Sequence, residues 1–261
     1  MKVVILTSHI EGIASRVLPA LYECKDITIT RVILAAGVPS NRKKHLKRKI
    51  KKTLKIGFLG ALNGIRLRKW YYDENAENIH SLCSSLDIQL CGIPSINSDA
   101  MKQNLRASGA DLGISLGNGY IPKSVFSIPK NGMINIHMEI LPEFRGAKSI
   151  LWPLYEGKSE TGFTIHQIDN RIDTGGILYQ ERYPIKFSPT LQETVKNNLI
   201  TARARIPVAF CHVCKNYETL KAKAIPQSNG RSYTTPALGQ FLRMVKNNRR
   251  FYKLHRKVHP Q

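Results

Sequence analysis

The fold is decided by the first 36 residues, MKVVILTSHIEGIASRVLPALYECKDITITRVILAA. Within them, the run Val3–Thr7 is apolar and rich in β-branched residues, which is typical of a buried strand. Ser8–Gly12 is then expected to form a turn, Ile13–Tyr22 a helix and Ile27–Ala36 a second strand. A strand, a helix and a strand at this spacing predict two parallel strands joined by a right-handed crossover.

The same alternation of apolar strands and amphipathic helices continues to residue 136. Helices are expected near 76–86 and 100–108, and strands near 88–91, 112–116 and 133–136. Near-continuous apolar strands between amphipathic helices indicate a parallel sheet that is covered on both faces. The sequence therefore predicts an α/β fold with a Rossmann-like, mostly parallel sheet.

The pattern becomes looser in the second half of the chain. Strands are expected over 162–168 and 176–183. Thr190 and Glu193 have the spacing of a capping box, which predicts the start of a long helix that runs towards Cys214.

Positive charge is concentrated in two segments. Residues 41–72 hold 12 Lys and Arg and no acid, and residues 219–261 hold 10 and no acid, so together they equal the net charge of +22. We expect one domain over 1–220 with a basic insertion at about 40–72, followed by a short basic C-terminal extension over 221–261. Such segments typically face phosphates, a nucleic acid or an anionic membrane surface, although a solvated lysine-rich face has the same composition.

Local patterns within the basic segments predict helices. Arg42–Leu54 has helical spacing, and Gly57, Gly60 and Gly64 are expected to break the structure that follows. In the extension, a short basic helix is expected to start at Pro236.

Composition excludes several classes of protein. Apolar residues make up 42% of the chain, which is too much for a disordered or fibrous protein. Five scattered cysteines favour a reduced, cytoplasmic protein over a disulfide scaffold. The pair Cys211-x-x-Cys214 lies alone in a helical pattern and is interpreted as ordinary helix residues, so no metal site is expected. No apolar run approaches the roughly 18 residues that a membrane span needs.

Polar side chains with acid-base chemistry follow the predicted strand at 133–136. Asn135 and His137 are two residues apart, so on a strand they face the same side, at the carboxyl end where open parallel sheets bind ligands. Asp173 lies in a predicted tight turn. An Asn that donates to an oxyanion, a His that moves a proton and an Asp that orients the His are suited to acyl transfer. By spacing alone, a structural His and a turn-forming Asp remain alternatives.

The run 135–178, NIHMEILPEFRGAKSILWPLYEGKSETGFTIHQIDNRIDTGGIL, resembles the signature of the folate-dependent formyltransferases. That family includes enzymes that act on glycinamide ribonucleotide, methionyl-tRNA and amino sugars. Its sub-motifs appear here in order: Asn-x-His at 135–137, Leu-Pro-x-x-Arg-Gly at 141–146, Thr-Gly-x-Thr at 161–164 and Asp-Thr-Gly at 173–175.

The resemblance implies a reaction and its co-substrate. A primary amine would attack the formyl carbon of 10-formyltetrahydrofolate, Asn135 and protonated His137 would stabilise the oxyanion, and Asp173 would hold His137. The pterin would lie against a loop that contains Gly119, Tyr120 and Ile121. The loop that begins with Ile168 and Asp169 would close over it, and no metal takes part.

The acceptor site is expected around other residues. Helix N-termini bind anions, so the turn with Ser8, His9 and Gly12 is a candidate for a phosphate of the acceptor. Arg145 is a second candidate. Glu139 stands where the family usually has Ser, and it either binds a hydroxyl or ammonium group of the acceptor or points to solvent.

Three hypotheses for the partner remain. In the first, the acceptor is a nucleotide-linked amino sugar destined for a surface polysaccharide such as lipopolysaccharide. In the second, it is methionyl-tRNA, whose enzymes also carry a basic insertion but have a C-terminal β-barrel for which this tail lacks the length and pattern. In the third, the aromatic and basic stretch Lys55–Tyr72 contacts an anionic membrane surface, which would place the protein at the inner membrane face. A homodimer is the default expectation.

Overall fold

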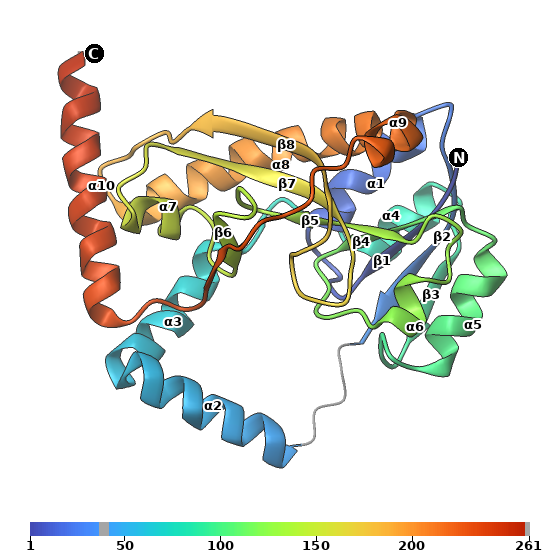
Figure 1. The fold of residues 1–261 in the computed structure, drawn as a ribbon, viewed down its shortest axis with the longest axis horizontal. Helices are drawn as coiled ribbons and strands as arrows, with labels where there is room; N and C mark the ends of the chain where they lie inside the picture. The colour runs from blue at the N-terminus through green and yellow to red at the C-terminus, as the bar shows by residue number, and fades with distance from the viewer. Residues whose placement is uncertain (37–41, 259–261) are drawn as a thin grey trace.

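A seven-stranded sheet forms the centre of the molecule in the computed structural model, which describes residues 1–36 and 42–258 (Figure 1). The strand order is β3-β2-β1-β4-β5-β7-β8. The five strands from β3 to β5 are parallel, and β7 and β8 are antiparallel to their neighbours. The strands are β1 Lys2–Thr7, β2 Thr28–Ala35, β3 Leu90–Ile93, β4 Leu112–Leu116, β5 Met133–His137, β7 Glu160–Gln167 and β8 Ile177–Pro184. The predicted α/β fold with a mostly parallel sheet is confirmed.

Helices cover both faces of this sheet because each central strand is apolar on both sides. In β1, Val3 and Ile5 enter a core with side chains of α1 (Ile13–Glu23), α4 (Ile79–Ser85) and α8 (Leu191–Lys215). Val4 and Leu6 enter a separate core with α5 (Asp99–Ser108) and α6 (Lys123–Phe126). The period of two along the strand thus separates the two layers of helices.

A third core joins the basic insertion to the basic tail. It contains Leu67 and Trp70 from α3 (Phe58–Trp70), Trp152 from α7 (Leu151–Tyr155), and Phe241 and Met244 from α10 (Leu238–Val258). The aromatic rings of Trp70 and Phe241 are 6.1 Å apart between centroids. Two segments that the sequence presents as separate basic attachments therefore fold against each other.

The predicted helix breaks at Gly60 and Gly64 are wrong. Both residues lie inside α3, and Gly57 alone separates α3 from α2 (Arg42–Ile56). A Cβ at Gly64 would lie 2.6 Å from Cγ2 of Thr235, so the missing side chain lets the tail approach the helix. The start of the expected insertion, residues 40–41, lies outside the described residues.

The structure of the C-terminal extension also differs from the prediction. The short helix expected from Pro236 is 21 residues long and begins at Leu238. The short helix α9 (Tyr217–Ala222) follows α8. Two further strands, β6 (Phe144–Gly146) and β9 (Arg231–Tyr233), form a separate parallel pair. They are too short to carry a period-two pattern, so sequence reasoning did not predict them.

The capping box predicted at the start of the long helix α8 is confirmed. The side chain of Thr190 accepts from the backbone N–H of Glu193, and the carboxylate of Glu193 accepts from the N–H of Thr190, which completes the capping box. Cys211 and Cys214 are free and lie in α8. Among the described helices, none has both the length and the apolar character needed to cross a membrane.

Candidate active site

A cleft of about 420 Å³ lies at the carboxyl ends of β4 and β5. The strand order reverses between β1 and β4, next to this cleft, because β2 lies on one side of β1 and β4 on the other. Open α/β sheets bind their ligands at such a switch point. The walls of the cleft come from the loop after β4, from β5, from the residues after β6 and from the loop between β7 and β8.

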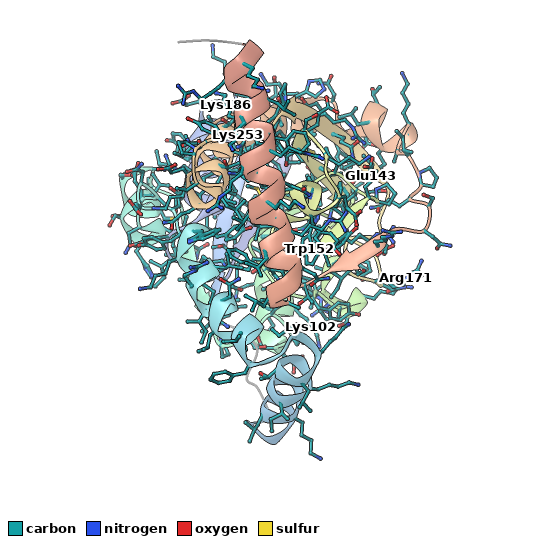
Figure 2. All side chains as sticks on the ribbon, turned by 90° about the vertical axis from the view of Figure 1, so that its left-hand side faces the viewer. Lys102, Glu143, Trp152, Arg171, Lys186 and Lys253 are labelled. Carbon is teal, nitrogen blue, oxygen red and sulfur yellow. The ribbon has the colours of Figure 1, made fainter. Side chains whose placement is uncertain are left out.

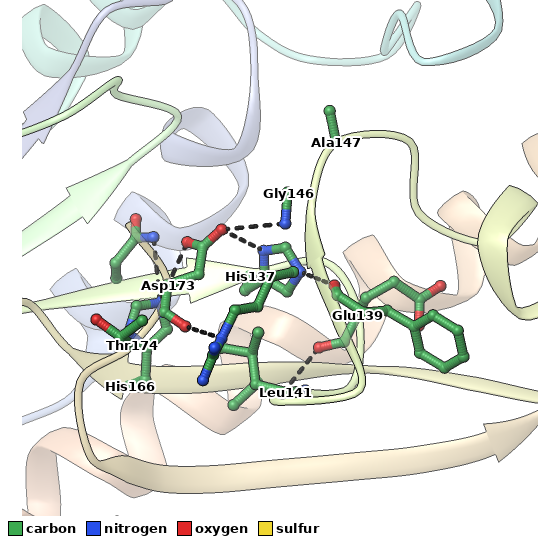
Figure 3. Close-up of polar contacts among 12 residues, drawn as sticks. His137, Glu139, Leu141, Gly146, Ala147, His166, Asp173 and Thr174 are labelled. Carbon is green, nitrogen blue, oxygen red and sulfur yellow. Dashed lines mark hydrogen bonds and ion pairs between the residues drawn. The ribbon is translucent and has the colours of Figure 1, made fainter. Parts of the chain in front are cut away.

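Asp173 is the centre of the polar contacts in this cleft (Figure 3). Its Oδ2 lies 3.5 Å from Nδ1 of His137, and its Oδ1 lies 3.8 Å from Nε2 of His166. The backbone N–H of Gly146 donates to the same Oδ2 at 3.3 Å. The Asp173 side chain is only 11% exposed, so its contacts with His137 and Gly146 act in a medium of low dielectric constant, where they are stronger than in water.

His137 has both ring nitrogens engaged. Nε2 donates to the carbonyl oxygen of Phe144 at 2.6 Å, and Nδ1 faces Asp173. A neutral ring with its proton on Nε2 would direct a lone pair from Nδ1 at the carboxylate, whereas an imidazolium donates from both nitrogens. The Phe144 carbonyl thus fixes a proton on Nε2, and Nδ1 is the nitrogen that faces Asp173.

Asn135 is held by His166, a residue that sequence reasoning missed. The two residues lie directly opposite each other on β5 and β7, and Nδ2 of Asn135 is 3.4 Å from Nε2 of His166. Nδ1 of His166 donates to the carbonyl of Gln167 at 2.7 Å. Burial lowers the pKa of His166, which keeps Nε2 available as an acceptor for the Asn135 amide. His166 lies within a predicted strand, but only the antiparallel register of β7 against β5 brings it to Asn135.

The residues expected to bind folate line the same cleft. Gly119, Tyr120 and Ile121 lie in the loop after β4, and Ile168 and Asp169 lie in the loop after β7. The backbone N–H of Ile168 donates to the carbonyl of Met133 at 2.8 Å, which fixes the start of the second loop to β5. The structure therefore brings both loops to the side chains of Asn135, His137 and Asp173.

The turn after β1 borders the cleft without lining it. Ser8 Oγ donates to Oδ1 of Asn118 at 2.8 Å, and Asn118 lines the cleft. The His9 ring lies beside Gly117, where a Cβ would come within 2.8 Å of His9 Cδ2. Gly12 is the N-cap of α1, with no side-chain hydrogen bond at that end. Acceptor binding by Ser8, His9 and Gly12 stays a prediction.

Both expectations for Glu139 are wrong. The side chain is 2% exposed, so it reaches neither an acceptor nor solvent. Oε1 accepts from the N–H of Ile150 at 2.5 Å and from Oγ1 of Thr161 at 2.8 Å, and Oε2 accepts from the N–H of Ile140 at 3.2 Å. Glu139 therefore connects the segment after β5 to the start of α7 and to β7.

Arg145 is also a structural residue in this conformation. Its Nε donates to the carbonyl of Asp173 at 3.1 Å, and one terminal nitrogen donates to Oε1 of Gln227 and to the carbonyl of Ser228. These bonds tie the loop of Asp173 to the tail. Acceptor binding by Arg145 stays a prediction, and in this conformation its Nε and one terminal nitrogen are bound within the protein.

The tail supplies one wall of the cleft through Tyr233. β9 pairs with β6, and Tyr233 packs on Trp152 with ring centroids 4.5 Å apart. Gln227 Nε2 donates to the carbonyl of Gly175 at 2.7 Å. Within residues 1–36 and 42–258, no group of three or more His, Cys, Asp or Glu side chains is placed to hold a metal ion.

The fold and the cleft define an α/β protein with an acyl-transfer type of site, and the sequence comparison identifies its family. The family model described as formyl transferase matches residues 69–208, more than half of the chain. The chain therefore belongs to the formyl transferase family.

Curated relatives carry two different names. A methionyl-tRNA formyltransferase of Deinococcus radiodurans is 45% identical over 91 residues, which is 34% of this chain and 28% of the relative. A GDP-perosamine N-formyltransferase of Brucella melitensis is 36% identical over 86 residues, which is 33% of each. The matches thus span about a third of the length of these relatives.

Solved structures share the fold. A phosphoribosylglycinamide formyltransferase from Anaplasma phagocytophilum has a TM-score of 0.58 at 16% identity, covering 89% of this chain and 99% of its own. An N-formyltransferase from Helicobacter canadensis, in complex with folinic acid and dTDP-3-aminofucose, has a TM-score of 0.54 at 16% identity. That match covers 97% of this chain and 81% of the other.

Proposed function

We propose that this protein transfers a formyl group from 10-formyltetrahydrofolate to the primary amine of a nucleotide-linked amino sugar, in the assembly of a surface polysaccharide. The observation that carries the proposal is the convergence of Asn135, His137 and Asp173 on one cleft of a chain that belongs to the formyl transferase family.

The side chains support a balanced acyl transfer. A bond forms between the amine nitrogen and the formyl carbon while the bond from that carbon to the folate nitrogen breaks. One N–H of Asn135 is held by His166, and the other donates to the oxygen on which negative charge develops. His137 contributes the charge of an imidazolium, which Asp173 stabilises. The proton lost by the amine passes to the leaving folate nitrogen through the His137–Asp173 pair and water.

The folate would occupy the part of the cleft formed by the two loops. A volume of about 420 Å³ lies in the range of pockets that bind small molecules. The loop with Gly119, Tyr120 and Ile121 would contact the pterin through its backbone, and the loop with Ile168 and Asp169 would close over it.

A nucleotide-linked amino sugar is the acceptor we favour. The Helicobacter canadensis enzyme is described with a dTDP-linked amino sugar, and its likeness extends over 97% of this chain. The turn with Ser8, His9 and Gly12 is next to the cleft, where a phosphate could meet the start of α1. The same proposal includes a cytoplasmic location and a homodimeric state.

Methionyl-tRNA is the second candidate acceptor. The 45% identity to a methionyl-tRNA formyltransferase and the 12 basic residues in 41–72 favour it. The two acceptors predict different responses to salt. Because a tRNA neutralises many cationic side chains, its affinity would fall steeply with salt, whereas a nucleotide with two phosphates would show a shallow dependence.

Folate binding can be tested by filling the cleft. Gly119 lines the cleft and a Cβ there meets no atom within 4 Å, so Gly119→Phe adds a large side chain at the cleft wall. In thermal unfolding, 5-formyltetrahydrofolate at about a hundred times its Kd should stabilise the parent protein by about 2.7 kcal/mol. The Gly119→Phe variant should lose this shift.

Gly92→Phe is the matched control, because a Cβ at Gly92 also meets nothing within 4 Å and this residue lies on the edge strand β3. The Gly92→Phe variant should keep the full stabilisation by 5-formyltetrahydrofolate. An equal shift in the Gly119 variant, or no shift in the parent protein, would contradict the folate site.

A further inference from the structure

Helix α3 is apolar on two sides, and only one of them is covered by the part of the chain that the structure describes. Its inner side, with Gly60, Gly64, Leu67 and Trp70, is buried against the tail and α10. Its outer side presents four large apolar side chains to solvent: Phe58 is 69% exposed, Leu59 57%, Leu62 48% and Ile65 60%. A helix with large apolar side chains on two sides normally has a neighbour on each of them.

Helix α2 extends this exposed apolar surface. Leu46, Ile50 and Leu54 are spaced four residues apart, so they form one row along the helix, and they are 58%, 50% and 80% exposed. Lys47, Lys51 and Lys55 form the adjacent row, and all three are exposed. We call α2 and α3 together, residues 42–70, the basic arm. Seven large apolar side chains in 20 residues are more than scattered surface positions explain.

The arm is placed to meet a surface outside the molecule. In two views at right angles, α2 forms the lower edge of the molecule, away from the central sheet (Figures 1 and 2). The inner side of α3 is fixed by the close approach of Thr235 at Gly64. Because that side is fixed, the apolar outer side of α3 cannot turn inward. Ile56, at the end of α2, is 8% exposed, in contrast to the apolar rows.

Charge decides between the possible occupants of this face. Residues 41–72 hold 12 Lys and Arg and no acid, so a second copy of this chain would bring like charge to like charge. A nucleic acid would use the lysines but would leave the apolar rows in water. An anionic bilayer uses both, because apolar side chains enter the headgroup boundary while lysines bind the lipid phosphates.

We propose that the basic arm docks this protein on the surface of an anionic lipid bilayer, with the apolar rows of α2 and α3 inserted and the lysine row at the headgroups. This interaction is separate from the cleft and does not depend on the proposed formyl transfer. Lysine side chains suit the boundary because their apolar stems lie along the acyl region while the ammonium groups reach the phosphates.

The test is sedimentation of the full chain with vesicles of phosphatidylcholine alone or of phosphatidylcholine and phosphatidylglycerol. We expect binding only to the anionic vesicles, and less binding at high salt. Lys47→Gln, Lys51→Gln and Lys55→Gln together should weaken it by about fivefold per lysine. Leu54→Ser with Phe58→Ser should weaken it at least as much. Phe58→Trp should give fluorescence that lipids with brominated acyl chains quench.

Matched controls come from the body of the protein. Ile200 and Val208 are 60% and 70% exposed on α8, so Ile200→Ser with Val208→Ser removes similar apolar surface elsewhere. Lys25, Lys130 and Lys215 are exposed lysines of the body, and their change to Gln removes the same charge. Both control proteins should bind vesicles like the parent.

Three results would overturn the proposal. One is equal binding to neutral and anionic vesicles. Another is full vesicle binding by the variant with Leu54→Ser and Phe58→Ser, which would mean that charge alone attracts the arm to an anionic surface. The third is a parent protein that binds no vesicles and forms a dimer in sedimentation equilibrium, where Leu54→Ser with Phe58→Ser makes the dimer dissociate. Far-ultraviolet circular dichroism of each variant checks that the arm remains helical.

Discussion

At the scale of single residues, Glu139 is a buried acid whose hydrogen bonds join the segment after β5 to the start of α7 and to β7. Burial raises the pKa of its carboxyl to about 7, against the opposing effect of hydrogen bonds from Ile150, Thr161 and Ile140. The folded protein therefore binds a proton at Glu139 more tightly than the unfolded chain, whose Glu titrates near 4.5. Stability at this site is lost as the pH rises from about 4.5 through 7.

Glu139→Gln should remove this pH dependence. Relative to the variant, the parent protein should lose about 3 kcal/mol of unfolding free energy between pH 5 and pH 8, because its carboxyl must ionise while buried. Urea unfolding at several pH values measures the difference. Glu143→Gln, at a 43% exposed side chain paired with Arg182, is the control and should change little. Parallel pH curves for the parent and the Glu139 variant would show that Glu139 does not titrate in this range.

How far the sequence predicts the site depends on which contacts are local. Asn135 and His137 share a face because a strand has a period of two, and both line the cleft. The contact of His166 with Asn135 depends on the register of two antiparallel strands, which the sequence does not specify. The burial of Glu139 depends on α7 and β7, which pack around it from later in the chain.

At the scale of elements, the tail is a part of the cleft. β9 pairs with β6 next to the loop of Asp173, and Gly230 lies where that pairing begins. A Cβ at Gly230 would lie 1.9 Å from the carbonyl oxygen of Pro142, so the tail can pack there only because residue 230 has no side chain. This close approach links the position of Tyr233 to the position of Asp173 through Arg145.

Gly230→Ala should displace the tail and lower the rate of formyl transfer. We expect a loss of tenfold or more in kcat, because the contacts that hold the Asp173 loop depend on the tail. Limited proteolysis should also cut the tail faster. Gly239→Ala is the control, since a Cβ there meets nothing within 4 Å and Ala favours the helix. Equal activity of the two variants would mean that the tail does not position the site.

Elements in which apolar residues recur regularly over several positions were predictable from the sequence. Elements that depend on contacts with residues far away in the chain were not. β4 has the predicted bounds of Leu112–Leu116, and β1 and β5 differ by one residue from expectation. The helix α3 was missed because Gly60 and Gly64 disfavour a helix locally, yet packing against the tail requires them. The pairing of β6 and β9 joins residues more than 80 apart in the chain, which no local pattern reveals.

At the scale of the whole molecule, the two basic segments are one structural feature. α3 and α10 share a core, so helices from both basic segments pack against each other. The Rossmann-like sheet supplies the cleft, and this added layer supplies a wall of it through Tyr233 and an exposed basic and apolar arm. We propose that the same chain binds small substrates in the cleft and an anionic surface through the arm.

The most direct test of this account is a formylation assay with 10-formyltetrahydrofolate and a panel of acceptors. The panel holds several nucleotide-linked amino sugars and initiator methionyl-tRNA, at low and high salt, with products identified by mass spectrometry. We predict formylation of one sugar nucleotide, little altered by salt and reduced on the order of 10² to 10³ in rate by Asn135→Ala, but not by Asn75→Ala. Formylation of the tRNA alone, vanishing at high salt, or of no amine in the panel, would contradict the account.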